Sequence, residues 1–378
     1  MIVSPVVLAI AHRVLPLFDA SPRLQPPSSP HVRWDALHFL AIADAGYKYE
    51  NQWAFLPGVP FLINLLRFQS NSYIWPIVLS AVAADSARIL YCLTRLHFPA
   101  SPAIARLVVL LSLFPSSPAT LYLAPYAEPF FTYLSYRGMF YAAQHHWIRA
   151  TLCFVLATFF RSNGVLLAGH LVWGLVVQPF IDRKQLSFFK MAYSIVLSAC
   201  AAAPFIYHNY KAYRLFCNTP NKPQWCYRIP PSIYTHVQAK YWDVGFLRYW
   251  TPAQIPNFVI AAPPLVLLIA FSAQHIKTCF LGFRTRFNGV KETDREENLF
   301  ATPSITPYLI HSLAMCITLI FFSHTQIVLR LAAALPALYW AVGWLFVCGS
   351  PWAKIWVWWS VLWGLISLGL WTAFLPPA

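Results

Sequence analysis

Long apolar runs are the feature that most constrains how this chain can fold. Of its 378 residues, 58% are hydrophobic and only 10% are charged, whereas a soluble domain carries roughly 25% charged residues. A helix that crosses a membrane needs about 20 mostly apolar residues. The runs are continuous, not alternating as barrel strands would be. The sequence therefore predicts an all-α polytopic membrane protein that forms one helical bundle.

The apolar runs predict about 9–11 membrane-spanning helices. The expected spans are 2–18, 73–93, 103–124, 126–143, 149–160, 164–181, 188–208, 256–273, 305–323, 326–347 and 352–375. The run 149–160 is short, so it either forms a broken helix with 164–181 or turns back within the membrane. The segment 55–68 contains Pro57-Gly58 and Pro60, which favours an interfacial or re-entrant helix.

Basic residues in the short loops predict the orientation, because cytoplasmic loops are enriched in Lys and Arg. They recur in alternate gaps, including the segment 274–304, which we interpret as cytosolic. On the opposite side of the membrane we then expect a first loop at 20–60, a second large loop at 209–253, and the polar groups between later spans. The candidate functional residues are thereby expected to gather on one face of the membrane.

The net charge of +15 does not indicate a nucleic-acid partner, because the basic residues are scattered between spans with no basic domain. They are better suited to contacts with membrane lipids. Cys217 and Cys226 share one polar loop, where they form either a disulfide in an oxidising lumen or two free thiols. The sequence contains no recognisable metal-ligand set, nucleotide-binding motif or cofactor motif.

Twelve acidic residues are present, which makes a search for a catalytic carboxylate short. Asp35 is the strongest candidate, since it lies beside Arg33 and Trp34 at the edge of the membrane, where charge is costly. Arg33 can bind a phosphate or orient the carboxylate, and Trp34 can stack on a sugar. The alternative is a structural salt bridge between Arg33 and Asp35, with Trp34 as an interfacial anchor.

Other charged residues near the spans have two open interpretations each. Glu128 either binds acceptor hydroxyls or caps the next helix. Arg161 and Arg330 either bind a lipid phosphate or pair with Glu128 or a carbonyl group. His324 either donates to a substrate or is an ordinary interfacial histidine. Glu50 is kept as a candidate because it is close to Asp35 in sequence.

Taken together, these segments resemble one family. The resemblance rests on the runs Arg33 to Tyr47, Ala54 to Gly58, Phe160 to Gly164, Phe216-Cys217, Trp225-Cys226, Tyr234 with Gln238, Tyr241 to Leu247, Pro256 to Phe258, and His324 to Gln326 with Arg330. In this order they resemble motifs of the GPI mannosyltransferase 2 family, of the PIG-V type. The match extends over nearly the whole chain, and the two departures from the family are a short first span and a shorter chain.

The resemblance implies a single GT-C-like transmembrane domain over residues 1–378, in the endoplasmic reticulum membrane, with its site on lumenal loops. The implied reaction transfers the second mannose, in α-1,6 linkage, from dolichyl-phosphate-mannose to a GPI-precursor glycolipid. The donor is β-linked, so the α product implies inversion by a single displacement. No cofactor or metal is implied, and a small accessory membrane subunit is an open possibility.

The same resemblance assigns roles to residues. Asp35 would be the base that takes the proton of the acceptor hydroxyl, and Cys217 and Cys226 would form a disulfide. The implied substrate-binding residues are Arg33, Trp34, His38, Glu50, Trp53, Glu128, Arg161, Asn163, His324, Gln326 and Arg330. The alternatives are another dolichyl-phosphate-mannose-dependent transferase with a different acceptor, and a transporter or flippase, which would show inverted repeats.

Overall fold

The computed structural model describes residues 3–18, 30–67, 74–287 and 299–375. Every regular element in these residues is helical, and six helices are long and apolar enough to cross a membrane. A bent helix pair raises the number to seven. This confirms the all-α polytopic class. The number of full-length spans is smaller than expected, because several apolar runs form helices too short to cross a membrane alone.

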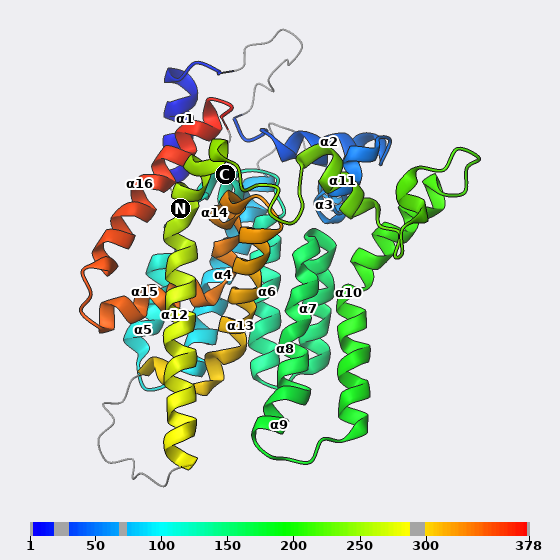
Figure 1. The fold of residues 1–378 in the computed structure, drawn as a ribbon. Helices are drawn as coiled ribbons and strands as arrows, with labels where there is room; N and C mark the ends of the chain where they lie inside the picture. Colours follow the sequence, from blue (N-terminus) through cyan, green and yellow to red (C-terminus); the bar gives the residue numbers. More distant parts are fainter. Residues whose placement is uncertain (1–2, 19–29, 68–73, 288–298, 376–378) are drawn as a thin grey trace.

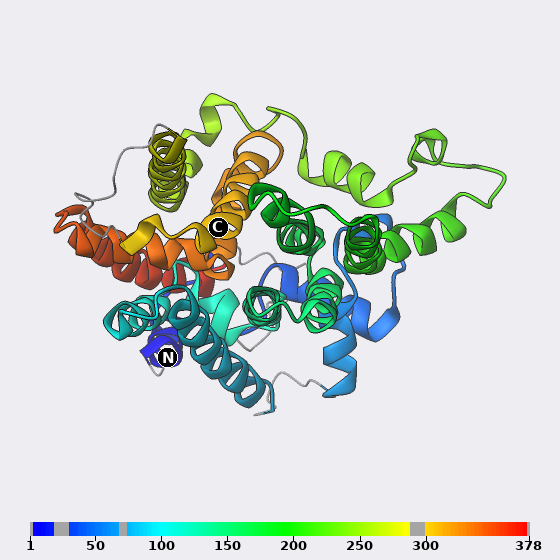
Figure 2. The same cartoon turned by 90° about the horizontal axis from the view of Figure 1, so that it is seen from below.

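The long helices run side by side. Figure 1 shows α4 (Ile74–His97), α6 (Glu128–Ala143), α7 (Trp147–Phe160), α10 (Phe188–Phe216), α12 (Ile255–Phe287) and α13 (Thr306–Phe321) along one direction of the bundle. Figure 2 views much of this set end-on. In contrast, α15 (Pro336–Val347) and α16 (Trp352–Thr372) lie across that view, and α1 (Val3–Val14) packs against α16.

The chain turns back at Arg161. Of the two interpretations of the run 149–160, the turn back is therefore observed, and a single broken helix with 164–181 is not. Arg161 has extended backbone angles (φ −145°, ψ 137°) and ends α7. The following segment, Ser162–Ile181, is a span that includes α8 (Ala168–Val172) and α9 (Gln178–Ile181) and packs against α7. A Cβ atom at Gly164 would lie 2.6 Å from the Thr158 backbone. Glycine is therefore required for this close return.

The expected span 326–347 is present as an apolar helix pair that is sharply bent. The segments Thr325–Ala334 and Pro336–Val347 meet at a bend of 85°. Pro336 is the physical cause, because proline lacks a backbone N–H and disfavours helical geometry in the residue before it. The bend leaves α14 (Val328–Leu331) at the end of the bundle and directs α15 into the core, where Trp340 is fully buried and donates to the Thr94 hydroxyl at 3.0 Å.

Four short elements cover one end of the bundle. They are α2 (Asp35–Ala45), η1 (Glu50–Ala54), α3 (Gly58–Leu65) and α11 (Ile233–Trp242), and Figure 1 shows α2, α3 and α11 beside α14. At the other end, α12 continues to Phe287, so the start of the expected loop 274–304 is helical. Residues 288–298 of that loop lie outside the described residues, as do 19–29 of the first loop.

Candidate active site

Glu128 is the centre of a buried ion-pair network. It occupies the first position of α6 and only 1% of its side chain is exposed. Its Oε1 atom accepts from Arg161 Nη1 at 2.6 Å and from Arg330 Nε at 2.7 Å, and Arg330 Nη2 lies 2.6 Å from the same oxygen. A buried carboxylate is stable only when it is paired and hydrogen-bonded. The alternative in which the two arginines pair with Glu128 is therefore observed.

Asp35 joins this network through Arg330. The Nη2 atom of Arg330 donates to Asp35 Oδ2 at 2.9 Å. The Asp35 side chain is 31% exposed, whereas that of Arg330 is 14% exposed. Arg330 therefore connects a buried carboxylate to one that solvent and ligands can reach. Asp35, Glu128, Arg161 and Arg330, predicted separately from sequence, form one cluster of two cations and two anions, which we call the charge quartet.

Tyr126 belongs to this site, although the sequence analysis did not select it. Its hydroxyl accepts from the Asp35 backbone N–H at 3.0 Å and donates to the Arg33 carbonyl at 3.3 Å. The Arg330 guanidinium lies 5.1 Å from the centre of its ring, which is within range of a cation–π contact. The signal that could have found it is its position two residues before Glu128, in the turn that leads into α6.

The two residues before Asp35 have their side chains turned elsewhere. Arg33 is fully buried, donates to the Val32 carbonyl at 2.9 Å and lies 5.2 Å from the Phe374 ring. The Trp34 ring also contacts Phe374, at 5.3 Å between centroids. Trp34 has a positive φ of 52°, a conformation that costs free energy for a non-glycine residue. The strained turn aims the Asp35 N–H at Tyr126.

A cavity of about 220 Å³ adjoins the charge quartet. Arg161 lines the cavity and donates to Glu128, so it belongs to both. The polar lining comes from Ser162, Asn163, Tyr234, Gln238, Thr318 and Ser323, and the rest is largely apolar, including Phe39, Phe55, Phe160, Leu319, Ile327 and Leu331. Mostly apolar walls with a few polar groups are typical of a binding site for a ligand that has both an apolar and a polar part.

Several predicted residues lie around this cavity. Asn163 lines it, with its amide nitrogen 3.9 Å from the Met315 sulfur. His38 lies one helical turn after Asp35 and stacks on Phe55 at 4.7 Å. Burial lowers the pKa of His38 below its ordinary value, although the Asp35 charge opposes this effect. His38 therefore remains neutral at neutral pH.

His324 and Gln326 have protein partners. His324 Nε2 lies 2.7 Å from the Trp242 carbonyl, and its ring stacks on Tyr249 at 4.6 Å. Gln326 accepts from the Tyr249 hydroxyl at 2.6 Å. These contacts connect the start of the segment Thr325–Ala334 to the end of α11 and the loop after it, and so fix the backbone that carries Arg330.

Glu50 and Trp53 join the first loop to the second. Lys240 and Tyr241 donate to Glu50 Oε2, the latter at 2.9 Å, and His236 lies 3.2 Å from Oε1. Burial alone would raise the pKa of Glu50, but these hydrogen bonds and charges outweigh it and lower the pKa. Trp53 is 4% exposed and packs on Tyr47 and His208. Glu50 thus holds α11 against η1, and Trp53 holds η1 against α10.

The disulfide expected from the resemblance is present. Cys217 and Cys226 are bonded, with their Cα atoms 5.7 Å apart, which is a usual separation. The alternative of two free thiols is therefore wrong. The bridge joins the end of α10 to the segment before α11, and Trp225, Ile233 and Val237 pack beside it.

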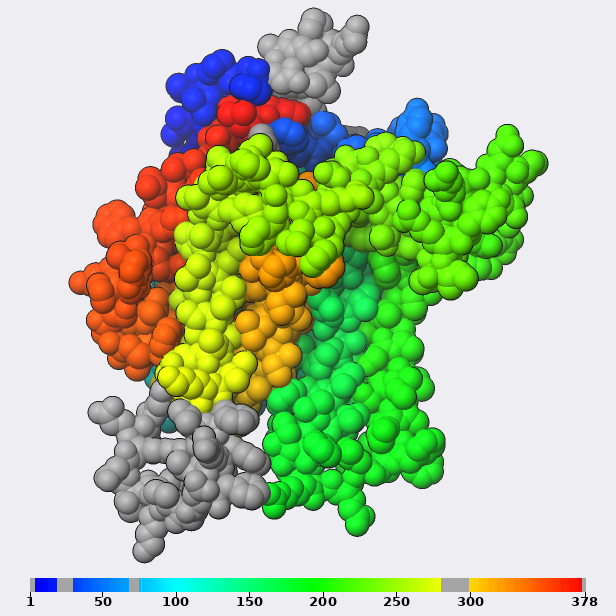
Figure 3. Space-filling model, viewed as in Figure 1, coloured from blue at the N-terminus to red at the C-terminus, as the bar shows by residue number. Residues whose placement is uncertain are grey.

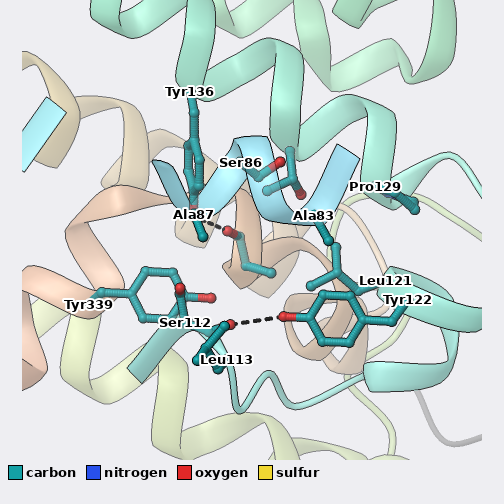
Figure 4. Close-up of a pocket in the computed structure, with 12 residues that line it drawn as sticks. Ala83, Ser86, Ala87, Ser112, Leu113, Leu121, Tyr122, Pro129, Tyr136 and Tyr339 are labelled. Carbon is teal, nitrogen blue, oxygen red and sulfur yellow. Dashed lines mark hydrogen bonds between the residues drawn. The ribbon is translucent and has the colours of Figure 1, made fainter. Parts of the chain in front are cut away.

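A second cavity lies against α6, where Pro129, Thr132 and Tyr136 line it (Figure 4). Hydroxyl groups of Ser86, Thr132, Tyr122, Tyr136 and Tyr339 surround it, and Tyr122 donates to the Ser112 carbonyl at 3.0 Å. Its volume of about 30 Å³ is that of one water molecule, which is too small for a sugar. Among the described residues, no group of His, Cys, Asp and Glu side chains is arranged to hold a metal ion.

Fold and site together define a polytopic membrane protein with a buried charge cluster and an adjoining cavity at one end of a helical bundle. A family model described as "Mannosyltransferase (PIG-V)" matches residues 28–378, and the chain belongs to this mannosyltransferase family. No solved structure matches the chain at a significant level.

Curated relatives agree with the family match. GPI mannosyltransferase 2 of Cryptococcus neoformans is 32% identical over 412 residues, which cover 98% of this chain and 95% of the relative. GPI mannosyltransferase 2 of Schizosaccharomyces pombe is 29% identical, with 92% and 73% covered. Human GPI alpha-1,6-mannosyltransferase 2 is 30% identical, with 81% and 71% covered. This chain is therefore a glycosyltransferase, and the transporter alternative is set aside.

Proposed function

We propose that this protein adds the second mannose of the GPI anchor. The donor is dolichyl-phosphate-mannose, the acceptor is the one-mannose GPI precursor, and the new bond is α-1,6. The reaction takes place on the lumenal side of the endoplasmic reticulum membrane. The names of the relatives support the acceptor and the linkage. The Cys217–Cys226 disulfide supports a lumenal face, because the lumen is oxidising.

The observation that carries this proposal is the charge quartet beside the cavity. Two guanidiniums suit a phosphate leaving group, and a partly exposed carboxylate next to them suits an acceptor hydroxyl. The apolar lining accommodates the first part of a polyprenyl chain and the polar lining a sugar. Residues 30–60 and the loop 209–253 supply much of this end of the molecule, consistent with one transmembrane domain.

Asp35 acts as the general base in this proposal. The acceptor oxygen forms a bond to mannose C1 while the bond from C1 to the phosphate oxygen breaks. Asp35 takes the hydroxyl proton, and the electron pair of the broken bond goes to the phosphate. The phosphodiester with one negative charge becomes a monoester with two, while Asp35 loses its charge. The net charge next to Arg330 is therefore unchanged through the step, which limits the electrostatic cost in a partly buried site.

Arg330 and Arg161 stabilise the departing phosphate. Their guanidiniums are already held by Glu128, so they need no reorganisation at the moment of reaction, and preorganised charge is the most effective kind. Arg330 also orients Asp35. A small accessory membrane subunit remains a partner that this proposal allows and does not require.

A membrane assay tests the proposal. Microsomes from cells lacking the endogenous enzyme are supplied with this protein, labelled dolichyl-phosphate-mannose and the one-mannose GPI intermediate. We expect a two-mannose product whose new mannose is released by an α-1,6-specific mannosidase. Depleted cells should accumulate the one-mannose precursor. Accumulation of a different glycolipid would instead identify a transferase with another acceptor.

A further inference from the structure

Residues 205–232 form a projection that we call the lateral lobe. It consists of the last part of α10, the disulfide-bonded turn and the segment that leads to α11. Helix α10 has 29 residues, about 43 Å at 1.5 Å per residue, which exceeds the roughly 30 Å of a hydrocarbon core. Pro204 lies inside this helix. Figures 1 and 3 show the part after it leaning outwards, so that the lobe extends beyond the bundle.

The lobe exposes large apolar and aromatic side chains. Ile229 is 99% exposed and Tyr227 is 73% exposed. Tyr207, Tyr210 and Leu215, on α10, are also exposed. Leaving side chains of this kind in water instead of an apolar phase is unfavourable. A surface of this composition therefore favours contact with another apolar phase.

The lobe is also strongly basic. Residues 205–232 contain no acidic residue and carry the cations Lys211, Arg214, Lys222 and Arg228. Two of these cations lie against exposed tyrosines, since Lys211 Nζ is 5.7 Å from the Tyr207 ring and Arg214 donates to the Tyr210 hydroxyl at 3.2 Å. Aromatic rings interleaved with Lys and Arg are typical of the headgroup region of a bilayer.

The exposed side chains are carried by an ordered scaffold. The Cys217–Cys226 bridge closes the turn, and Ala212, Trp225 and Ile233 are each fully buried behind it. The apolar tip is therefore held in place, because its backbone is anchored on both sides of Tyr227 and Ile229.

We propose that the lateral lobe binds the phospholipid headgroup layer beside the bundle, on the face that carries the site. Tyr227 and Ile229 enter the interface and the basic residues contact lipid phosphates. Since α11 follows the lobe directly and lines the cavity with Tyr234 and Gln238, this contact fixes the height of the cavity wall relative to the bilayer. A lipid-linked sugar at the same depth then meets the cavity.

Photolabelling of the full-length protein in nanodiscs tests this contact without any transfer assay. The probe is phosphatidylcholine with a diazirine close to its glycerol, and adducts are mapped by mass spectrometry. The matched control is Tyr49, which is 66% exposed and lies in the first loop on the same side. We expect the peptide with Tyr227 and Ile229 to be labelled about five-fold or more above the Tyr49 peptide, as befits an interfacial segment.

The variant Tyr227→Ser/Ile229→Ser should reduce this labelling to the Tyr49 level while the Cys217–Cys226 bridge stays intact. A second variant, Lys222→Ser/Arg228→Ser, should remove any increase caused by adding phosphatidylserine to the nanodisc. Labelling of the wild-type lobe no higher than at Tyr49 would overturn the proposal. A protein partner on the lobe would also overturn the proposal. Such a partner would co-purify from membranes with the wild type, leave the lobe weakly labelled by lipid, and be lost in the Tyr227→Ser/Ile229→Ser variant.

Discussion

Arg330 donates to Asp35 at 2.9 Å across a separation of 295 residues in the sequence. The same guanidinium donates to Glu128, whose carboxylate also holds Arg161. The exposed and the buried carboxylates therefore share one cation. In the proposed reaction this arrangement lets a proton enter at Asp35 while negative charge develops at a phosphate beside Arg330 and Arg161.

Asp35→Asn should lower the rate of mannose transfer by at least about 100-fold, because an amide cannot take the proton of the acceptor hydroxyl. The measurement is the initial rate in the microsomal assay at saturating donor. Asp44→Asn is the matched control, since Asp44 lies on the same helix α2 and is exposed. A wild-type rate for Asp35→Asn would exclude Asp35 as the base.

Arg330→Met should destabilise the protein by about 3–5 kcal/mol, the usual cost of removing one partner of a buried ion pair. It leaves Glu128, 1% exposed, with Arg161 alone. Thermal unfolding in detergent is the readout. In Lys184→Met the ion pair with Asp182 is exposed on both sides, and the expected cost is below about 1 kcal/mol. Equal shifts in the two variants would contradict the structural importance of the charge quartet.

Gly164→Ala should destabilise the turn after α7 by about 1–3 kcal/mol, as expected when atoms are forced into a packed site. The new Cβ would lie 2.6 Å from backbone atoms of Thr158, which cannot move aside as a side-chain end could. Gly169→Ala is the control five residues later, because nothing lies within 4 Å of its Cβ position. We expect no loss of thermal stability in the control, and the argument fails if both variants unfold at the same temperature.

Acid should loosen the contact between η1 and α11. The pKa of Glu50 is lowered below its ordinary value of 4.5 by Lys240, Tyr241 and His236, despite burial. A group with a lowered pKa contributes stability above its ordinary pKa and loses it as the pH falls through the lowered value. The protection factors of the α11 amides in hydrogen exchange should therefore fall below about pH 4.5.

The control for this effect is Glu50→Gln, which removes the titrating group. In that variant, the protection factors of the α11 amides should be lower than in the wild type at neutral pH. These protection factors should also change less on acidification. If wild type and variant respond equally to acid, another group controls this contact.

Cys217→Ser should destabilise the lateral lobe by about 2–3 kcal/mol, because a disulfide over a short loop restricts the unfolded chain. The bridge closes a separation of nine residues. Limited proteolysis should cut the variant faster between α10 and α11. Cys200→Ser, at an exposed free cysteine, should be cut at the wild-type rate, and rapid cutting of this control as well would exclude the disulfide as the cause.

The sequence indicated the membrane class and the residues of the charge quartet. Long, continuous apolar runs with few charges favour a bilayer over water, so the class follows from composition. Asp35, Glu128, Arg161 and Arg330 were found because charge is scarce in this chain and costly near hydrocarbon. How these residues pair was left open, since each had more than one possible partner.

The structure alone decided how the charge quartet pairs, where the span 326–347 bends, and that Tyr126 belongs to the site. A bend of 85° before Pro336 places Arg330 beside Asp35, and an apolar run does not show in sequence whether it continues straight. The sequence contains nineteen tyrosines, and no local pattern distinguished Tyr126 from the others. The structure shows that its hydroxyl accepts from the Asp35 backbone N–H.

Composition and local motifs thus determined which charged groups need a partner in this protein. The reason is that the free-energy cost of removing a group from water depends on its residue type and on the apolar run around it. Tertiary structure decided which groups meet, because Asp35 and Arg330 are brought together by helix packing over most of the chain, and no local pattern encodes a contact at that separation.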